Sequence, residues 1–390
     1  MVKPWTHWAT SADLVSLRLP AHDAGTGLVG RRLGISLLGG DFVLDPFDAY
    51  AAGLVTNPNV VVAGSIGAGK STVVKMTVDR ALDRGRRAVV IDPKGEYGAL
   101  ARAHGVVPVA LGRDGWCDPF PDEERECREL LAAVVASAQQ TSLSSDELFE
   151  LDAAWSTLAH PRPRRVLAAL HGVLAGSLAG PPSARRTLAL TVRRFVEGDL
   201  AGLFDGEGEP LTLDSALVVV DLSSQWSSGS LSVAVLTAVS AARRVIGSGG
   251  GLGYLVLDES WALLADGPAL RWLQGSWKLA RARGLCHVLV LHRWSDVGAV
   301  GAHGSESRER ARGLLRECET AWLFRQPPDE AAEMADALGL RPLERRYLTS
   351  LGRGQALVRY GPWRSIVRVT PDERDAAFID TDAAMRADPT

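Results

Sequence analysis

Short apolar runs alternate along this chain with longer segments of helical periodicity. The apolar runs, each five or six residues long and nearly continuous, lie at 59–63, 87–92, 216–221, 253–258, 287–292 and 321–325. Apolar residues at helical spacing occupy 72–82, 230–246 and 267–283. Strands that are apolar on both faces and alternate with helices are typical of a parallel sheet covered on both sides. The pattern therefore predicts an α/β fold. The runs 355–360 and 363–370 are expected to form a closing β-hairpin at its end.

The pattern also divides the chain into regions. Residues 1–55 mix short apolar alternations with glycines, and we expect a small β-rich segment there, with a first strand near 14–19. Residues 120–210 show helical periodicity interrupted by prolines, which indicates an all-α insertion. The insertion separates two parts of one α/β core, and a short tail ends the chain. The predicted core parts and tail are 56–119, 211–375 and 376–390.

The octet at 64–71, Gly-Ser-Ile-Gly-Ala-Gly-Lys-Ser, is a complete phosphate-binding loop between a predicted strand and a predicted helix. Its glycines let the backbone turn its N–H groups toward nucleotide phosphates, and the helix N-terminus adds positive potential. Lys70 is expected to reach the β- and γ-phosphates, and Ser71 to ligate Mg²⁺. The sequence thus predicts ATP and Mg²⁺ as ligands. The candidate nucleotide-binding residues are Gly64, Ser65, Ile66, Gly67, Ala68, Gly69, Lys70, Ser71 and Thr72.

Hydrolysis needs a carboxylate linked to the metal and a base that orients water. The run that ends with Leu257-Asp258-Glu259 can supply both. Asp258, at the carboxyl end of a buried strand, fits the Mg²⁺ role. Glu259 fits the group that polarises the attacking water.

These motifs resemble the hexameric ATPases of conjugal transfer and type IV secretion, within the broader group of HerA- and FtsK-like pumps. The resemblance extends to Asp-Pro-Lys-Gly-Glu-Tyr at 92–97, to 257–264 and to 278–285. It implies a RecA-like P-loop core and a ring, expected to be a hexamer, that hydrolyses ATP. It also implies secretion or conjugation channel proteins as partners, and DNA as a further candidate. The sequence assigns no role to the turn at 92–97.

The resemblance places an arginine finger at Arg281. The residues give separate support, because Leu270, Leu273 and Trp277 form one helical stripe that Arg281 extends. A permanent charge on that side needs a partner, and the γ-phosphate bound by a neighbouring subunit would provide one. An arginine that interacts with the helix dipole remains an alternative.

The chain departs from the family pattern at two places. The family usually has Gln at the end of the strand 287–292, where this chain has His292. A neutral imidazole can donate one hydrogen bond and accept another, so we expect His292 to act as the γ-phosphate sensor. A structural histidine is the alternative. Residues 1–55 are also too short to replace the large domain that many secretion ATPases carry before the motor.

Composition limits the remaining choices. The chain has 390 residues and a net charge of −3, so the whole surface does not suggest nucleic-acid binding. Residues 122–152 hold nine acidic side chains, whereas 153–196 hold seven arginines and no acid. This split could form partner surfaces or a self-complementary solvated face. Two readings are also open for four tryptophans, which could stack bases or simply pack: Trp261, Trp272, Trp277 and Trp294.

No apolar run approaches the ~18 residues that cross a membrane, and the first residues lack a signal-peptide core. We therefore expect a cytoplasmic protein that reaches the inner face of the cell membrane only through partners. The four cysteines form no ligand or disulfide pattern and are expected to be reduced thiols. The leading function is an ATP-driven motor of a conjugation or type IV secretion apparatus. A HerA- or FtsK-like DNA pump and a slow nucleotide-gated scaffold are the alternatives.

Overall fold

The computed structural model describes residues 26–37, 39–112, 115–158, 162–178, 182–204, 215–226, 230–248, 251–292 and 304–380. Its strands join in a single large sheet. They are β1 (Gly34–Ser36), β2 (Asp41–Phe42), β3 (Val60–Ala63), β4 (Arg87–Asp92), β5 (Val109–Ala110), β6 (Leu217–Asp221), β7 (Gly253–Leu257), β8 (Leu285–Leu291), β9 (Thr320–Phe324), β10 (Gln355–Tyr360) and β11 (Trp363–Val369).

The sheet has a parallel part and an antiparallel extension. Its strand order is β2-β1-β11-β10-β9-β3-β8-β7-β4-β6-β5. All pairs from β9 to β5 are parallel, whereas β10, β11, β1 and β2 continue the sheet in antiparallel pairs. Strand β8 lies between β3 and β7 and pairs with both. The predicted α/β fold with a mostly parallel sheet is therefore confirmed.

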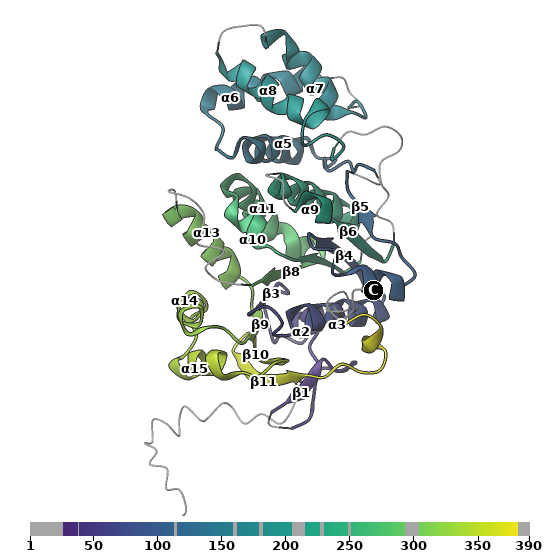
Figure 1. Ribbon diagram of the computed structural model, residues 1–390, viewed down its shortest axis with the longest axis vertical. Helices are drawn as coiled ribbons and strands as arrows, with labels where there is room; N and C mark the ends of the chain where they lie inside the picture. The colour runs from purple at the N-terminus through teal and green to yellow at the C-terminus, as the bar shows by residue number, and fades with distance from the viewer. Residues whose placement is uncertain are drawn as a thin grey trace, which may run out of the picture.

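Helices cover both faces of the sheet (Figure 1). Alternate residues of each central strand point to opposite faces, so Val60 and Val62 join one core cluster while Val61 and Ala63 join the other. One face carries α2 (Pro46–Ala51), α3 (Lys70–Asp83) and α4 (Gly98–Ala103). The other carries α9 (Leu231–Ser248), α10 (Trp261–Ala265), α11 (Gly267–Ala280), α13 (Gly304–Arg316), α14 (Pro328–Leu338) and α15 (Pro342–Ser350).

A further helical layer stacks on α9 and α11 (Figure 1). Its members are α5 (Glu124–Gln139), α6 (Ser145–Ser156), α7 (Val166–Leu174) and α8 (Ala184–Glu197). We call these four helices the helical insert. The sequence starts α6 with a capping box, in which Ser144 Oγ accepts from the Glu147 N–H and the Glu147 carboxylate accepts from the Ser144 N–H. The described part of 120–210 contains no strand.

The described part of 1–55 joins the main sheet, since β1 pairs with β11. The strand expected near 14–19 lies outside the described residues. Residues that lie far before and far after α3 in the sequence both form ion pairs with this helix. Arg31 forms an ion pair with Asp79 of α3 at 2.5 Å, and Arg80 of α3 pairs with Asp375, 295 positions later. Within the described residues no helix is long and apolar enough to span a bilayer.

Candidate functional site

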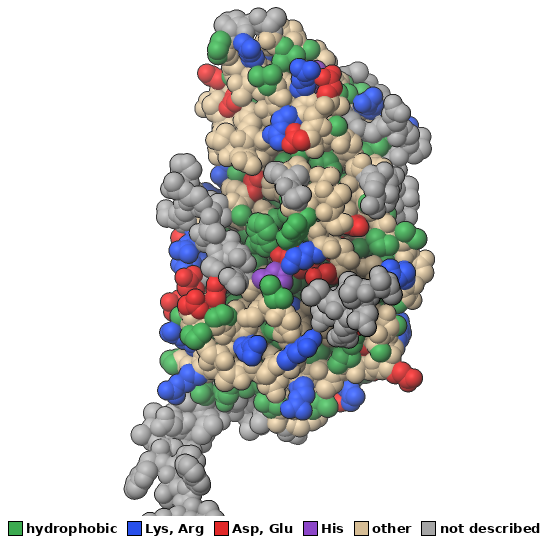
Figure 2. All heavy atoms as spheres, in the orientation of Figure 1, with side chains coloured by type: hydrophobic (Ala, Val, Ile, Leu, Met, Phe, Trp, Pro, Cys, Tyr) green, Lys and Arg blue, Asp and Glu red, His purple; other side chains and the backbone are tan. Residues whose placement is uncertain are grey.

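The carboxyl ends of β3, β8, β7 and β4 lie at one edge of the sheet, because these strands are parallel neighbours. The residues that directly follow them are the phosphate-binding loop, His292, Asp258 and the turn at 92–97. Segments far apart in the sequence therefore meet at this edge. In Figure 2, acidic, basic and histidine side chains gather at mid-height of the molecule beside a hydrophobic patch.

The phosphate-binding loop is fixed to its neighbours by backbone hydrogen bonds. The Ser65 N–H donates to the Arg325 carbonyl at 3.0 Å, just past the end of β9. The Gly354 N–H donates to the Ala68 carbonyl at 2.9 Å. The loop is thus anchored on both sides while its tip stays in solvent, where Ile66 is 79% exposed.

Three glycines of the loop serve backbone geometry. Gly67 and Gly69 have φ of 73° and 115°, a left-handed region that other residues rarely adopt. A Cβ on Gly64 would lie 2.5 Å from the Cβ of Phe324, closer than packed atoms approach. Gly69 also begins α3 without a side-chain cap, so the first N–H groups of that helix remain available to an anion.

Lys70 is folded back onto the loop. Its ammonium donates to the carbonyls of Gly64 at 2.7 Å and Ser65 at 3.0 Å. Burial lowers the pKa of Lys70 to about 8, although the nearby carboxylates of Asp258 and Glu259 act against that shift. A phosphate group would supply the compensating negative charge at closer range.

The turn at 92–97 is organised by the side chain of Asp92. Its carboxylate accepts from four consecutive N–H groups, including those of Gly95 at 2.9 Å and Tyr97 at 2.9 Å. The turn presents two charged side chains to the site. Glu96 accepts a hydrogen bond from Ser71 Oγ at 3.1 Å, and Lys94 reaches Glu259 and His292.

Asp258 is a buried carboxylate in an acidic neighbourhood. Burial is the main cause that raises its pKa to about 6, and the charges of Glu259, Glu96 and Asp92 add to the shift. A cation would relieve this repulsion, and hydroxyl and carboxylate oxygens are ligands that Mg²⁺ accepts. No group of three or more potential ligands among the described side chains forms a closed metal site. Ser71 and Asp258 fit instead a Mg²⁺ that takes its other ligands from phosphate and water.

Glu259 is held from three sides. Its Oε1 contacts both Lys94 Nζ and His292 Nε2, and its Oε2 accepts from Trp261 Nε1 at 2.7 Å. Burial alone would raise the pKa of Glu259, but the contacts with His292 and Lys94 outweigh it and hold that pKa below its usual range. The backbone of Glu259 has a φ of 51°, in the left-handed region. Such conformations in residues other than glycine concentrate at functional sites.

His292 follows directly after β8, between the loop after β3 and the acidic pair after β7. Its Nε2 contacts Glu259, and Lys94 Nζ lies 3.1 Å from the same nitrogen. The imidazole thus stands beside the candidate base. The sequence placed His292 at this edge but gave no sign of its contact with Glu259.

Arg281 lies apart from these contacts. The helix predicted over 267–283 ends at Ala280, and Arg281 begins a 3₁₀ turn in which its side chain is exposed. The backbone of Arg281 is still helical, with φ of −59° and ψ of −44°, but the buried stripe of Leu270, Leu273 and Trp277 does not continue to it, and its side chain lies in solvent. The guanidinium has no hydrogen-bond or ion-pair partner in the described part of the chain.

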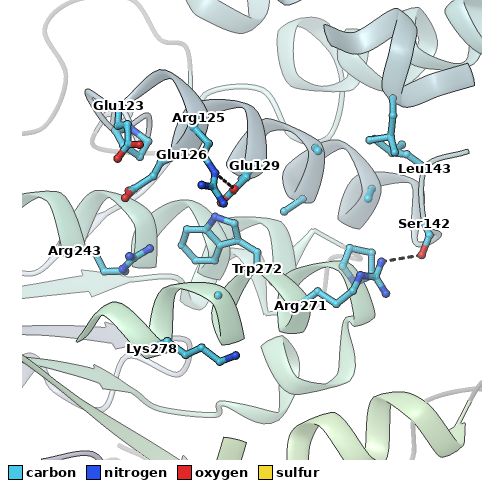
Figure 3. A pocket seen from close by; sticks show the side chains of 17 residues that line it. Glu123, Arg125, Glu126, Glu129, Ser142, Leu143, Arg243, Arg271, Trp272 and Lys278 are labelled. Atoms are coloured by element: carbon cyan, nitrogen blue, oxygen red, sulfur yellow. Dashed lines mark hydrogen bonds and ion pairs between the residues drawn. The ribbon is translucent and has the colours of Figure 1, made fainter. Parts of the chain in front are cut away.

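Three of the four tryptophans lie in the described residues, and Trp294 lies outside them. Trp277 is buried and stacks on His287 with ring centroids 4.1 Å apart. Trp272 lines a groove of about 930 Å³ between α5 and α11. Figure 3 shows Trp272 between the Arg125–Glu129 pair of α5 and Lys278 of α11. Packing thus accounts for Trp277, whereas Trp272 is half-buried.

Sequence reasoning missed Lys94, Glu96 and Trp261 as members of this edge. A signal existed for the first two, because they follow a predicted strand in a turn that resembles a family motif. Lys94 lies more than 150 positions before Glu259, and this separation hid their contact, which depends on β4 pairing with β7.

Known proteins share part of this sequence and the fold. The chain matches the family model described as helicase HerA, central domain, over residues 54–227. No curated protein matches the sequence significantly. The structure of VirB4 of Thermoanaerobacter pseudethanolicus superposes with a TM-score of 0.79 and 20% identity, covering 91% of this chain and 100% of that chain.

The bacterial conjugative coupling protein TrwBdeltaN70 is also similar. Its unbound monoclinic form gives a TM-score of 0.52 at 18% identity, covering 92% of this chain and 99% of that chain. Its trigonal form in complex with sulphate gives a TM-score of 0.58 at 17% identity, covering 90% of this chain and 93% of that chain. At these identities the structural matches show the fold. The chain thus has the RecA-like fold of VirB4 and TrwB and matches the HerA central domain over residues 54–227, which confirms its resemblance to the HerA-like and conjugal-transfer ATPases.

Proposed function

We propose that this chain is a Mg²⁺-dependent ATPase that works as the ring motor of a conjugation or type IV secretion apparatus. It would couple hydrolysis to the transfer of a macromolecule or to assembly of the apparatus. The observation that supports this function is the meeting of a complete phosphate-binding loop with Asp258 and Glu259 at one sheet edge. Channel proteins at the inner face of the membrane are the partners that such a motor needs.

Each side chain then has a role. The loop N–H groups and Lys70 bind the phosphates, and Ser71 and Asp258 hold Mg²⁺, which neutralises phosphate charge when bound. Glu259 accepts the proton of the attacking water, and His292 orients that water or the γ-phosphate. Arg281, exposed at the end of α11, enters the site of a neighbouring subunit in the ring. Solved TrwB complexes contain ADPNP, or ADP and Mg²⁺, which supports the same ligands here.

A DNA pump is the second candidate, because residues 54–227 match a helicase family model. Both candidates use the same hydrolytic site and differ in what they move. A pump should show ATPase activity that DNA stimulates strongly and that falls steeply with salt.

The first experiment measures ATPase activity and native mass of the purified protein, with and without DNA. Hydrolysis with a mass several times that of one chain would support the ring motor. Strong stimulation by DNA would favour the pump. Binding of ATP with negligible turnover under saturating Mg²⁺-ATP would instead support a slow nucleotide-gated scaffold.

Lys70→Ala tests the nucleotide site itself. Loss of a charge-assisted contact should weaken ATP binding by roughly one order of magnitude or more. Lys278→Ala is the matched control, since Lys278 is exposed on α11, outside the phosphate loop. Equal affinity of Lys70→Ala and Lys278→Ala for ATP would contradict the proposed site.

A further inference from the structure

The carboxylate of Glu259, which is the catalytic base in the proposed function, already has hydrogen-bond and ion-pair partners in the structure. Three donor groups surround Glu259, which is 2% exposed: Lys94 Nζ, His292 Nε2 and Trp261 Nε1. An ionised carboxylate has about four acceptor positions, so these donors leave little room for a water. Both acceptor positions of Oε1 are occupied by Lys94 and His292, so a water can donate to this oxygen only after one of these two partners leaves.

Lys94 is the partner best able to leave. Its ammonium and the His292 imidazole both contact Oε1 of Glu259, and one nitrogen of His292 cannot donate to the carboxylate and accept from Lys94 at the same time. When His292 Nε2 donates to Oε1, the two groups therefore share this oxygen without a hydrogen bond between them. The Lys94 side chain is 29% exposed, whereas the Trp261 ring is packed edge-to-face against Trp226, with centroids 6.2 Å apart.

Lys94 also lies within electrostatic reach of the phosphate loop. Its charge is one of those that lower the pKa of Lys70, so the two ammonium groups repel each other across the site. A γ-phosphate placed between them would attract both. The four-carbon stem of a lysine is flexible, and Asp92 fixes the backbone from which this stem extends.

We propose that Lys94 is a second cation for the γ-phosphate, and that it holds Glu259 while no nucleotide is bound. This inference rests on the proposed function. When ATP binds, Lys94 leaves Glu259 for the γ-phosphate, and the carboxylate becomes free to accept a proton from water while His292 keeps it oriented. ADP has no γ-phosphate, so with ADP Lys94 stays on Glu259. The turn at 92–97 thereby reports which nucleotide occupies the site.

The first test measures binding rather than turnover. Calorimetric affinities for ADPNP and for ADP, each with Mg²⁺, are compared in the wild type, Lys94→Met, Lys94→Arg and the control Lys278→Met. Loss of a charge-assisted contact should weaken ADPNP binding by Lys94→Met roughly 10- to 100-fold. ADP binding should change less than about threefold by the same reasoning, since ADP lacks the group that Lys94 contacts. Lys94→Arg should retain most of the preference for ADPNP, and Lys278→Met all of it.

A lysine that only supports the fold would change both affinities together, or neither, and either result overturns the proposal. A wild type that binds neither nucleotide would instead overturn the proposed function.

A second test needs no variant of Lys94. The chain has five lysines, so acylation of each one can be followed by mass spectrometry in the full-length protein. ADPNP should protect Lys94 several-fold more than ADP does, and Lys278 should react equally in both. Equal reactivity of Lys94 with the two nucleotides would overturn the proposal even if Lys94→Met fails to fold.

Discussion

The nucleotide-site edge and the helical insert are both rich in charge, but they use it differently. In the insert, half-buried arginines pair with nearby acids, as Arg185 does with Glu150 at 2.9 Å and Arg194 with Asp199 at 2.7 Å. At the sheet edge, Lys70, Asp258 and Glu259 are buried, and their pKa values are shifted. Exposed pairs contribute about 0–1 kcal/mol each, whereas a buried charge needs a partner.

The comparison shows why sequence charge alone misleads. The acidic and basic stretches in 122–196 are compatible with a partner surface or with a self-complementary face, and the Arg185–Glu150 pair between the two stretches favours the self-complementary face. The site carries fewer charges, but its charges are held by contacts that a nucleotide could replace. Shifted pKa values with specific partners are typical of functional sites.

Arg281→Ala should cause the largest loss of ATPase activity, because the proposed arginine finger would act on charge that develops in the reaction. Such arginines contribute roughly 10³-fold or more in rate. Mixing Arg281→Ala subunits, which keep an intact loop, with Lys70→Ala subunits, which keep an intact finger, should restore part of the ATPase activity. Mixed rings that co-assemble without any recovery would show that Arg281 does not act between subunits.

Glu259→Gln should keep ATP bound while turnover falls roughly 10²- to 10⁴-fold, since an amide cannot accept the proton of water. Single-turnover measurement with bound ATP separates binding from chemistry. The base assignment would be falsified if the variant hydrolysed ATP at the wild-type rate.

His292→Ala should bind ATP normally and hydrolyse it roughly 10-fold more slowly, as expected for loss of one hydrogen bond that orients water or phosphate. His292→Gln should restore most of the activity because an amide can also donate and accept. Unchanged turnover in His292→Ala would favour a structural histidine.

His287, in β8, is a buried histidine that takes no part in the proposed hydrolysis, and it should affect how the stability of the fold depends on pH. Burial is the main cause that lowers its pKa to about 3, and Arg243 adds to the shift. The unfolded chain takes up this proton near pH 6.5 and the folded chain only near pH 3, so the free energy of unfolding falls as pH falls between these values. The slope from this group is at most about 1.4 kcal/mol per pH unit. In urea unfolding at pH 7, 6 and 5, the free energy of unfolding of His287→Gln should depend less on pH than that of the wild type. Equal slopes in the two proteins would show that burial does not lower the pKa of His287.

The smallest effect on turnover is expected in the insert. Reversal of Arg185, Arg186, Arg193 and Arg194 to Glu should leave basal ATPase activity within about twofold, because exposed ion pairs contribute little. If the insert also binds a partner, the same variant should lose affinity for DNA or a channel protein. A folded, assembled variant without basal activity would make the insert part of the motor.

The sequence was a good guide wherever one local pattern decides the structure. The apolar runs predicted β3, β4, β6, β7, β8 and β9 to within about two residues, because buried parallel strands have a strong local signature. It was a poor guide to contacts that depend on strand order. Nothing in the local sequence shows that Lys94 contacts Glu259, or that α11 ends at Ala280 and a 3₁₀ turn begins at Arg281. The left-handed backbone of Glu259 is likewise set by its surroundings.

Two ion pairs that hold α3, Arg31–Asp79 and Arg80–Asp375, affect how the chain folds while it is being synthesised. Arg80, on the helix that directly follows the phosphate loop, pairs with Asp375, which leaves the ribosome 295 residues later. Arg31, which also binds this helix, leaves the ribosome before Arg80 does. Contacts of such long sequence separation form late. The helix that begins with Lys70 therefore lacks its contact with Asp375 until residue 375 has been synthesised, and the support that this contact gives to the phosphate-loop helix arrives late.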